Sequence, residues 1–195
     1  MAAPAFVAAI LLALCGGAAG DPRTAVARQA CAQGGAVSGP ALAVNFVPAM
    51  DDLNSNVSAN GFGMSAVGSG PNTVFGLGQC LRDLSPVDCK LCFAEVRSLL
   101  PKCYPRAGGR LYLDGCFGRY ANYSFFAEAL GPDDAVNCGG AGVGGNYTGP
   151  NPRGFADAVR AALANVTAAA ARGDGYAVGS ASTGGTTAFA LAQCW

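Results

Sequence analysis

Apolar residues recur at helical spacing in the segment after Cys80. Ser85, Pro86 and Asp88 favour a helix start, since Ser is a good N-cap, Pro suits the first helical position and an acid suits the first turn. The periodic run continues until Pro101, which is expected to end the helix. The stripe that this spacing predicts to be buried consists of Cys89, Cys92, Phe93, Val96, Leu100 and Cys103.

A further helix is predicted earlier in the chain, beginning between Asn45 and Pro48. Segments 72–80 and 110–120 instead alternate like strands, with Leu111 and Leu113 on one face. Strands and helices joined by short turns predict an α+β fold, in which two helices lie on one antiparallel sheet. The earlier helix is expected to face the core with Val47, Met50, Leu53 and Val57.

One stretch of sequence occurs twice. "GFGMSAVGSGPNTVFGLGQC" (61–80) and "GYAVGSASTGGTTAFALAQC" (175–194) share the ending Thr-x-Phe-x-Leu-x-Gln-Cys. Upstream of each lies a helix candidate, and upstream of that a lone cysteine, Cys31 or Cys138. This ordered agreement predicts two copies of one structural unit.

The repeat suggests a division of the chain. Residues 1–20 form a short apolar run ending in small residues, which predicts a secretory signal peptide, since the run is too short to span a bilayer. We expect a first domain over 27–130 and the N-terminal half of a second over 134–195. A Gly/Asn/Pro-rich linker over 131–153 overlaps the start of that second copy. The half-unit ends before its second helix and is expected to fold poorly alone.

The charge pattern excludes several classes of function. The 12 Lys and Arg residues balance the 12 Asp and Glu residues without a basic cluster, so we expect no nucleic-acid partner. No histidine occurs, which excludes Ser-His-Asp and Cys-His catalysis and His-dependent zinc sites. No second apolar stretch of membrane-spanning length follows the signal peptide, so the mature chain is predicted to be secreted, without a membrane span of its own.

The cysteines are predicted to form disulfides. Of nine cysteines, Cys15 leaves with the signal peptide, and eight in an oxidising compartment form a disulfide framework. Spacing alone leaves 15 possible pairings for six of them. Redox chemistry at Cys89-Lys-Leu-Cys92 is disfavoured, because no thioredoxin-like pattern surrounds it. A zinc site built from Cys80, Cys89, Cys92 and Cys103 is equally disfavoured in a secreted chain.

Other candidate chemistry is also weak. Asp51-Asp52 and Asp133-Asp134 are adjacent pairs that suit a solvated helix start and a linker better than acid–base catalysis. The glycines of 139–145 lie in the linker, without the strand and helix of a phosphate-binding loop. We therefore expect no catalytic residue, cofactor or metal site, and no enzyme activity. Four N-glycosylation sequons are expected on exposed loops: Asn56, Asn122, Asn146 and Asn165.

The spacing Cys80-x8-Cys89-x2-Cys92 in "CLRDLSPVDCKLC", with "CFGRYANYSF" (116–125) after it, resembles the plant ginkbilobin-homologous, or stress-antifungal, domain. The likeness covers the first unit and the front half of a second. It implies two helices over a five-stranded antiparallel sheet. It also implies the disulfides Cys31–Cys103, Cys80–Cys89 and Cys92–Cys116, whereas Cys138 and Cys194 would be unpaired because their partners would lie after position 195.

Tandem copies resemble the ectodomains of cysteine-rich receptor-like kinases, plasmodesmata-located proteins and cysteine-rich repeat secretory proteins. The resemblance implies a secreted, non-enzymatic recognition module of plant stress or defence signalling. It would act in the apoplast and bind an extracellular protein or a cell-wall glycan. The alternative is a truncated receptor-like kinase ectodomain, at the cell surface or a plasmodesma if the full-length protein has a transmembrane segment.

A third hypothesis is a mannose-binding antifungal lectin. Ginkbilobin binds mannose through an Asn, an Arg and a Glu, and those positions correspond here to Ala32, Arg110 and Ala121. Because only Arg110 matches, mannose binding at this site is expected to be weak or absent. Arg110 is then predicted to be an ordinary strand-edge charge.

Overall fold

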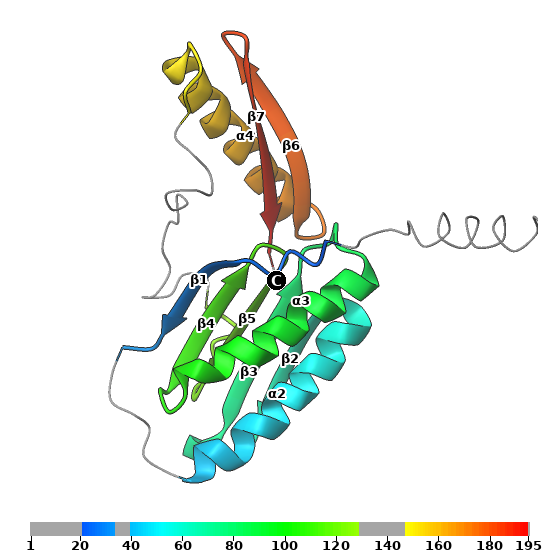
Figure 1. Ribbon diagram of the computed structural model, residues 1–195, viewed down its shortest axis with the longest axis vertical. Helices are drawn as coiled ribbons and strands as arrows, with labels where there is room; N and C mark the ends of the chain where they lie inside the picture. Colours follow the sequence, from blue (N-terminus) through cyan, green and yellow to red (C-terminus); the bar gives the residue numbers. More distant parts are fainter. Residues whose placement is uncertain (1–20, 34–39, 129–146, 195) are drawn as a thin grey trace, which may run out of the picture.

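A five-stranded antiparallel sheet carries two helices on one of its faces (Figure 1). The computed structural model describes residues 21–33, 40–128 and 147–194. The first unit contains β1 (Val26–Cys31), α2 (Pro40–Asn60), β2 (Phe62–Val67), β3 (Val74–Cys80), α3 (Pro86–Leu99), β4 (Gly108–Leu113) and β5 (Cys116–Ala121). The second contains α4 (Pro152–Arg172), β6 (Tyr176–Thr183) and β7 (Thr186–Gln193). The predicted α+β fold is confirmed, with a third helix in the second unit.

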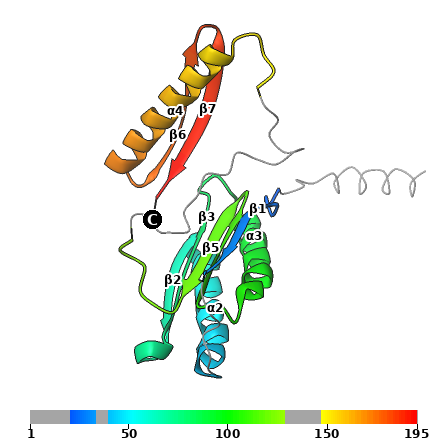
Figure 2. The same ribbon diagram turned by 90° about the vertical axis from the view of Figure 1, so that its left-hand side faces the viewer.

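The strand order of the large sheet is β1-β4-β5-β3-β2, and all neighbours are antiparallel. Figure 2 shows α2 and α3 side by side on the same face. The main core lies between them and the sheet, and a smaller cluster around Leu77, Ala121 and Phe125 lies on the opposite face. The sheet is therefore covered on both faces, by helices on one and by residues 122–128 on the other.

Helix α3 follows the sequence prediction closely. The Ser85 hydroxyl accepts a hydrogen bond from the Asp88 amide at 3.1 Å, which caps the helix as expected. All of the predicted stripe is buried, from Cys89 to Cys103. The α-helix ends at Leu99 and continues as a 3-10 turn, η2 (Leu100–Cys103), which contains Pro101.

Helix α2 differs from its prediction. It begins at Pro40, not between Asn45 and Pro48, and Pro48 lies inside it. Its buried stripe therefore starts earlier, at Leu42 and Phe46, and continues through Met50, Leu53 and Val57. Val47 was predicted to face the core, but it is 58% exposed because a helix that buries position 46 turns position 47 away.

Two glycines let α3 lie directly on the sheet. A Cβ at Gly78 would lie 2.4 Å from the ring of Phe93, and a Cβ at Gly118 would lie 2.3 Å from a methyl of Val96. Any side chain at either position would force the helix away from β3 or β5.

Three disulfides link the ends of these elements. They join Cys31 to Cys103, Cys80 to Cys89 and Cys92 to Cys116. The first ties β1 to η2, and the other two tie α3 to β3 and to β5. These are the pairs that the family resemblance implies.

The second unit repeats part of the first. Helix α4 packs on the β6–β7 hairpin, with Ala158, Ala162 and Ala188 in a small core. The hairpin register matches, since Tyr176 pairs with Gln193 as Phe62 pairs with Gln79. In each unit the cysteine amide donates to the carbonyl of a positive-φ glycine, Cys80 to Gly61 at 2.7 Å and Cys194 to Gly175 at 2.8 Å. The sequence repeat thus corresponds to a structural repeat.

Some predictions lie outside the described residues: the signal peptide (1–20), Cys138, Asn146, the Asp133-Asp134 pair and most of the linker. Within 21–33, 40–128 and 147–194, no helix combines the length and hydropathy needed to cross a membrane.

The disulfides are expected to stabilise the fold according to the loops they close. The cysteines of Cys31–Cys103 are 72 residues apart, and those of Cys80–Cys89 are 9 apart. In the chain-entropy model, replacing both cysteines by Ala should lower the free energy of unfolding by about 4 kcal/mol for the first pair and about 2.5 kcal/mol for the second. Urea unfolding of the two double variants measures this, and a larger loss for the shorter loop would contradict it.

Candidate functional site

The two units meet through the same pair of residues in each copy. The Gln79 side chain donates to the carbonyl of Cys194 at 3.2 Å, and the Gln193 side chain donates to the carbonyl of Cys80 at 2.8 Å. The ends of β3 and β7 therefore recognise each other reciprocally, which gives the junction an approximate two-fold symmetry.

Arg82 reinforces the junction from one side. Its backbone amide donates to the Gln193 side-chain oxygen at 3.1 Å, and its guanidinium donates to the carboxylate and the carbonyl of Asp174. The guanidinium also lies 5.8 Å from the ring centre of Tyr176, within cation–π range. One arginine of the first unit thus contacts three residues of the second.

The hydrogen bond from Arg82 lowers the pKa of Asp174 below its ordinary value of 3.8. Both side chains are exposed, at 45% for Arg82 and 74% for Asp174. Solvent screens such a pair, so its main effect is to orient the second unit rather than to add much stability.

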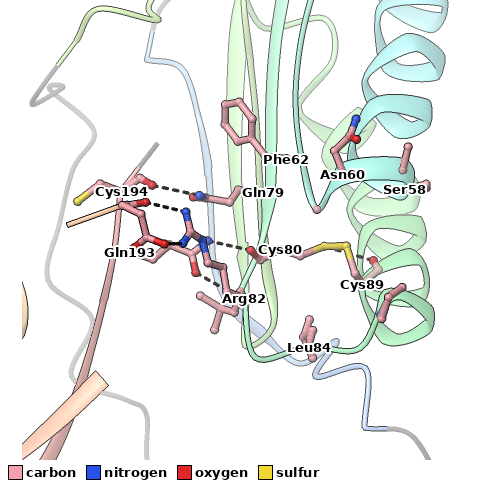
Figure 3. A pocket seen from close by; sticks show the side chains of 15 residues that line it. Ser58, Asn60, Phe62, Gln79, Cys80, Arg82, Leu84, Cys89, Gln193 and Cys194 are labelled. Carbon is pink, nitrogen blue, oxygen red and sulfur yellow. Dashed lines mark hydrogen bonds and ion pairs between the residues drawn. A yellow bond between two sulfur atoms is a disulfide. The ribbon is translucent and has the colours of Figure 1, made fainter. Parts of the chain in front are cut away.

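A cleft of about 760 Å³ opens beside this junction (Figure 3). The C-terminal end of α2 contributes Ser58 and Asn60, and β2 contributes Phe62. Gln79 and Arg82 line the cleft as well. An aromatic ring beside amide, hydroxyl and guanidinium groups can hold a polar ligand by stacking and hydrogen bonding.

The cleft lies beside the paired ends of β3 and β7. Asn60 and Phe62 occupy the positions in the first unit that Asp174 and Tyr176 occupy in the second. Arg82 contacts the second pair. Asn60 is exposed at the end of α2, and its side-chain nitrogen donates to the carbonyl of Asn56 at 3.2 Å.

The lining offers binding groups rather than a catalytic set. Its carboxylate, Asp174, is engaged by Arg82. Across the part of the chain that the structure describes, no three His, Cys, Asp or Glu side chains gather as a metal site would require.

A second, smaller cavity contains the positions of the mannose hypothesis. Ala32, Arg110 and Ala121 line one cavity of about 50 Å³, so the fold does bring them together. Arg110 is not the predicted strand-edge charge. It is only 5% exposed and lies on β4, between β1 and β5, where it pairs across the strands with Arg119.

The neighbouring arginine, Arg119, is held by residues of the segment that follows β5. Arg119 donates to Glu128 at 2.7 Å and to the Tyr123 hydroxyl at 3.1 Å, and it stacks 3.7 Å from the ring centre of Phe125. The hydrogen bond from Arg119 lowers the pKa of Glu128, and burial raises the pKa of Tyr123. Because pockets for small molecules start at about 300 Å³, this cavity is too small to enclose a sugar.

The family follows from comparison with known proteins. A family model described as "Salt stress response/antifungal" matches residues 30–123. These residues form a salt stress response/antifungal domain. The resemblance drawn from the cysteine spacing is thereby confirmed.

Relatives of this domain occur in larger plant proteins. Cysteine-rich receptor-like protein kinase 2 of Arabidopsis thaliana is 42% identical over 179 residues, which cover 90% of this chain and 26% of the kinase. The chain thus spans about a quarter of that protein's length. Cysteine-rich repeat secretory protein 38 of the same plant is 32% identical over 77 residues, which cover 39% of this chain and 31% of the relative.

A solved structure shares the fold. The tandem DUF26 ectodomain of the Arabidopsis thaliana cysteine-rich receptor-like protein PDLP8 superimposes with a TM-score of 0.61 at 19% identity. The match covers 88% of this chain and 78% of that ectodomain, so it extends past the salt stress response/antifungal domain into the second unit.

The sequons differ in their surroundings. Asn56 is half-buried within α2, and its amide nitrogen donates to the carbonyl of Met64 at 3.3 Å and to Asp52 at 3.4 Å. Asn165 is exposed on α4, and Asn122 follows β5 beside the small cavity. Asn56 and Asn165 thus lie in helices and not in the loops that the sequence analysis expected.

The junction residues Arg82 and Asp174 were not predicted from the sequence. The repeated Gln-Cys ending was the available signal, since it marks Gln79 and Gln193 as equivalent, but it does not predict that they touch. Among the described cysteines, Cys194 is unpaired and exposed.

The Arg82–Asp174 contact can be tested by titration. The Asp174 pKa, measured by carbon-detected NMR, should lie below 3.8 and rise toward that value in Arg82→Ala. Because the folded pKa is the lower one, the pair stabilises the junction above the ordinary pKa and is lost as the pH falls through the folded value. Arg97→Ala, which removes the similarly exposed pair with Asp51, is the control and should leave Asp174 unchanged. An ordinary Asp174 pKa in the unmodified chain would contradict the contact.

Proposed function

We propose that this chain is an extracellular, non-enzymatic recognition module of plant stress or defence signalling, and that its ligand binds in the junction cleft. The observation that carries the proposal is the cleft itself, which Asn60, Phe62 and Arg82 line together. The relatives support the setting, since they are named as receptor-like kinases and secretory proteins.

The cleft chemistry suits a cell-wall oligosaccharide or an extended peptide of an extracellular protein. Sugar rings stack on aromatic faces, and their hydroxyls pair with amide and guanidinium groups. An extended peptide offers the same hydrogen-bonding groups along its backbone. The antifungal lectin hypothesis is less favoured, because Ala32 and Ala121 supply no polar group and the cavity at Arg110 is small.

The proposal includes the domain organisation. Residues 1–20 would be a signal peptide, 27–130 the first domain and 134–195 the first half of a second. The family match over 30–123 supports the first domain, and the repeated helix and hairpin of 152–193 support the second.

A second candidate is the sensing part of a receptor-like kinase. The identity of 42% with receptor-like protein kinase 2, over 90% of this chain, favours it. Transcript sequence beyond position 195 separates the two: a stop codon supports a secreted module, and a transmembrane run followed by kinase motifs supports a receptor.

Ligand binding at the cleft can be tested on an array of plant cell-wall oligosaccharides and on peptides of apoplastic proteins. Asn60→Ala should weaken binding about tenfold, because one or two hydrogen bonds are lost. Asn54→Ala is the matched control, since Asn54 lies on the same helix outside the cleft. Equal losses in both variants, or no binding by the unmodified chain, would contradict the cleft as the site.

Glycan occupancy should differ between the sequons. We propose that Asn165 carries a glycan and that Asn56 does not, because a glycan replaces one hydrogen of the Asn56 amide nitrogen, which then cannot donate to both Met64 and Asp52. Enzymatic deglycosylation in heavy-oxygen water, followed by peptide mass spectrometry, measures both sites in one sample. Full occupancy of Asn56 would overturn the assignment.

A further inference from the structure

Strand β2 is an edge strand of the large sheet (Figure 2). The amide of Cys80 donates to the carbonyl of Gly61 at 2.7 Å, which fixes the register of β2 on β3. Backbone groups alternate in direction along an antiparallel strand. The N–H and C=O groups of Phe62, Met64 and Ala66 therefore point away from β3, and in the described part of the chain no strand pairs with them.

The two edge strands of this sheet differ in how they are protected. Strand β1, at the other edge, has an irregular register between Val26 and Arg28, and it carries the charge of Arg28. Bulges and charges are usual features that keep an edge strand from pairing with another chain. Strand β2 is regular over its six residues and contains neither a charge nor a proline. The β2 edge is therefore suited to accept a further strand.

The β2 edge has different surroundings on its two sides. Gly63 faces α2, so Phe62 and Met64 face the other side, where Met64 is 46% exposed. On the α2 side, the Asn56 amide donates to the outward carbonyl of Met64 at 3.3 Å and to the Asp52 carboxylate at 3.4 Å. Asp52 is exposed, and among the described residues its carboxylate has no ion-pair partner. An added strand meets apolar side chains on one side and a carboxylate on the other.

These surroundings define the chemistry of a partner strand. Its residues opposite Phe62 and Met64 have their side chains on the apolar side, and the residue between them faces α2. A lysine or arginine at that middle position is placed to reach Asp52, so charge complementarity favours the pattern apolar–basic–apolar. A second copy of β2 fits poorly, because 62–67 contains no cation and the pairing places two Asp52-bearing helices side by side.

We propose that an extended segment of another extracellular protein, with a basic residue between two apolar ones, binds by adding a strand to the β2 edge. Its backbone exchanges hydrogen bonds with Phe62, Met64 and Ala66. The Met64 carbonyl accepts a second hydrogen bond beside that of Asn56, because a carbonyl oxygen has two lone pairs. Of these residues and Asp52, Phe62 alone also lines the junction cleft, so the site is distinct from that cleft.

The test uses the full chain, produced without glycans in a bacterial periplasm, and two dye-labelled peptides. The first is Thr-Val-Lys-Val-Lys-Val-Thr, and the second has Glu in place of both lysines. In fluorescence anisotropy, the Lys peptide should bind at least about fivefold more tightly than the Glu peptide. Asp52→Lys should invert this preference. Asp114→Lys makes the same change of net charge in the exposed turn between β4 and β5 and should not alter it.

Met64→Pro tests the backbone contact. Proline removes the outward N–H of residue 64, whereas the hydrogen bonds between β2 and β3 use residues 63, 65 and 67 and stay in place. The Lys peptide should bind about tenfold more weakly to this variant. Met64→Val, which keeps the N–H, is the matched control. Asn60→Ala, which alters the junction cleft, should leave the affinity unchanged, so this test and the test of the cleft fail independently.

Hydrogen exchange followed by NMR locates the contact without any substitution. The amides of Phe62, Met64 and Ala66 should exchange fast in the free chain and slow down when the Lys peptide is added. The amides of 63, 65 and 67 should be slow in both states, since they bond to β3. Failure of the Lys peptide to bind, equal affinity for the Glu peptide, or protection confined to other segments overturns the proposal. A loss of affinity in Asn60→Ala places the peptide in the cleft and overturns it as well.

Discussion

The fold depends on the covalent attachment of α3 to the sheet. Cys80–Cys89 joins the start of this helix to the end of β3, and Cys92–Cys116 joins its next turn to β5. The same helix also packs closely on the sheet at Gly78 of β3 and Gly118 of β5, without covalent bonds. Together they fix the end of β3, the point from which Gln79 and Arg82 reach the second unit.

The fixed end of β3 positions the junction between the two units. Both copies of the repeat end in Gln-Cys, and each glutamine side chain donates a hydrogen bond to the carbonyl of the other copy's cysteine. Arg82 adds contacts from the first unit to Asp174 and Tyr176. The cleft that Asn60 and Phe62 line beside this junction supports a binding role for the chain.

The repeated strand has two neighbours in the first unit and one among the described residues of the second. In the first unit, the internal strand β3 pairs with β5, and Phe125 packs against its outer face. In the part of the chain that the structure describes, β7 has the same alternation and pairs with β6 alone.

The sequence by itself determined what depends on near neighbours. Capping by Ser85 and the stripe from Cys89 to Val96 defined α3, and the repeated Gln-Cys ending predicted the structural repeat. Family resemblance, rather than spacing, supplied the disulfide pairs. The earlier start of α2 and the outward turn of Val47 were missed, because a helical stripe can be read in more than one phase when its first turn is unknown.

Only the tertiary structure showed that Arg110 is buried and where the cleft lies. Arg110 is buried because β4 lies between two other strands, which no local pattern reveals. The junction joins Gln79 to Cys194 across more than a hundred residues. Side-chain periodicity indicates which face of an element is buried, but not which distant element buries it, and the junction and its cleft are made by such distant pairs.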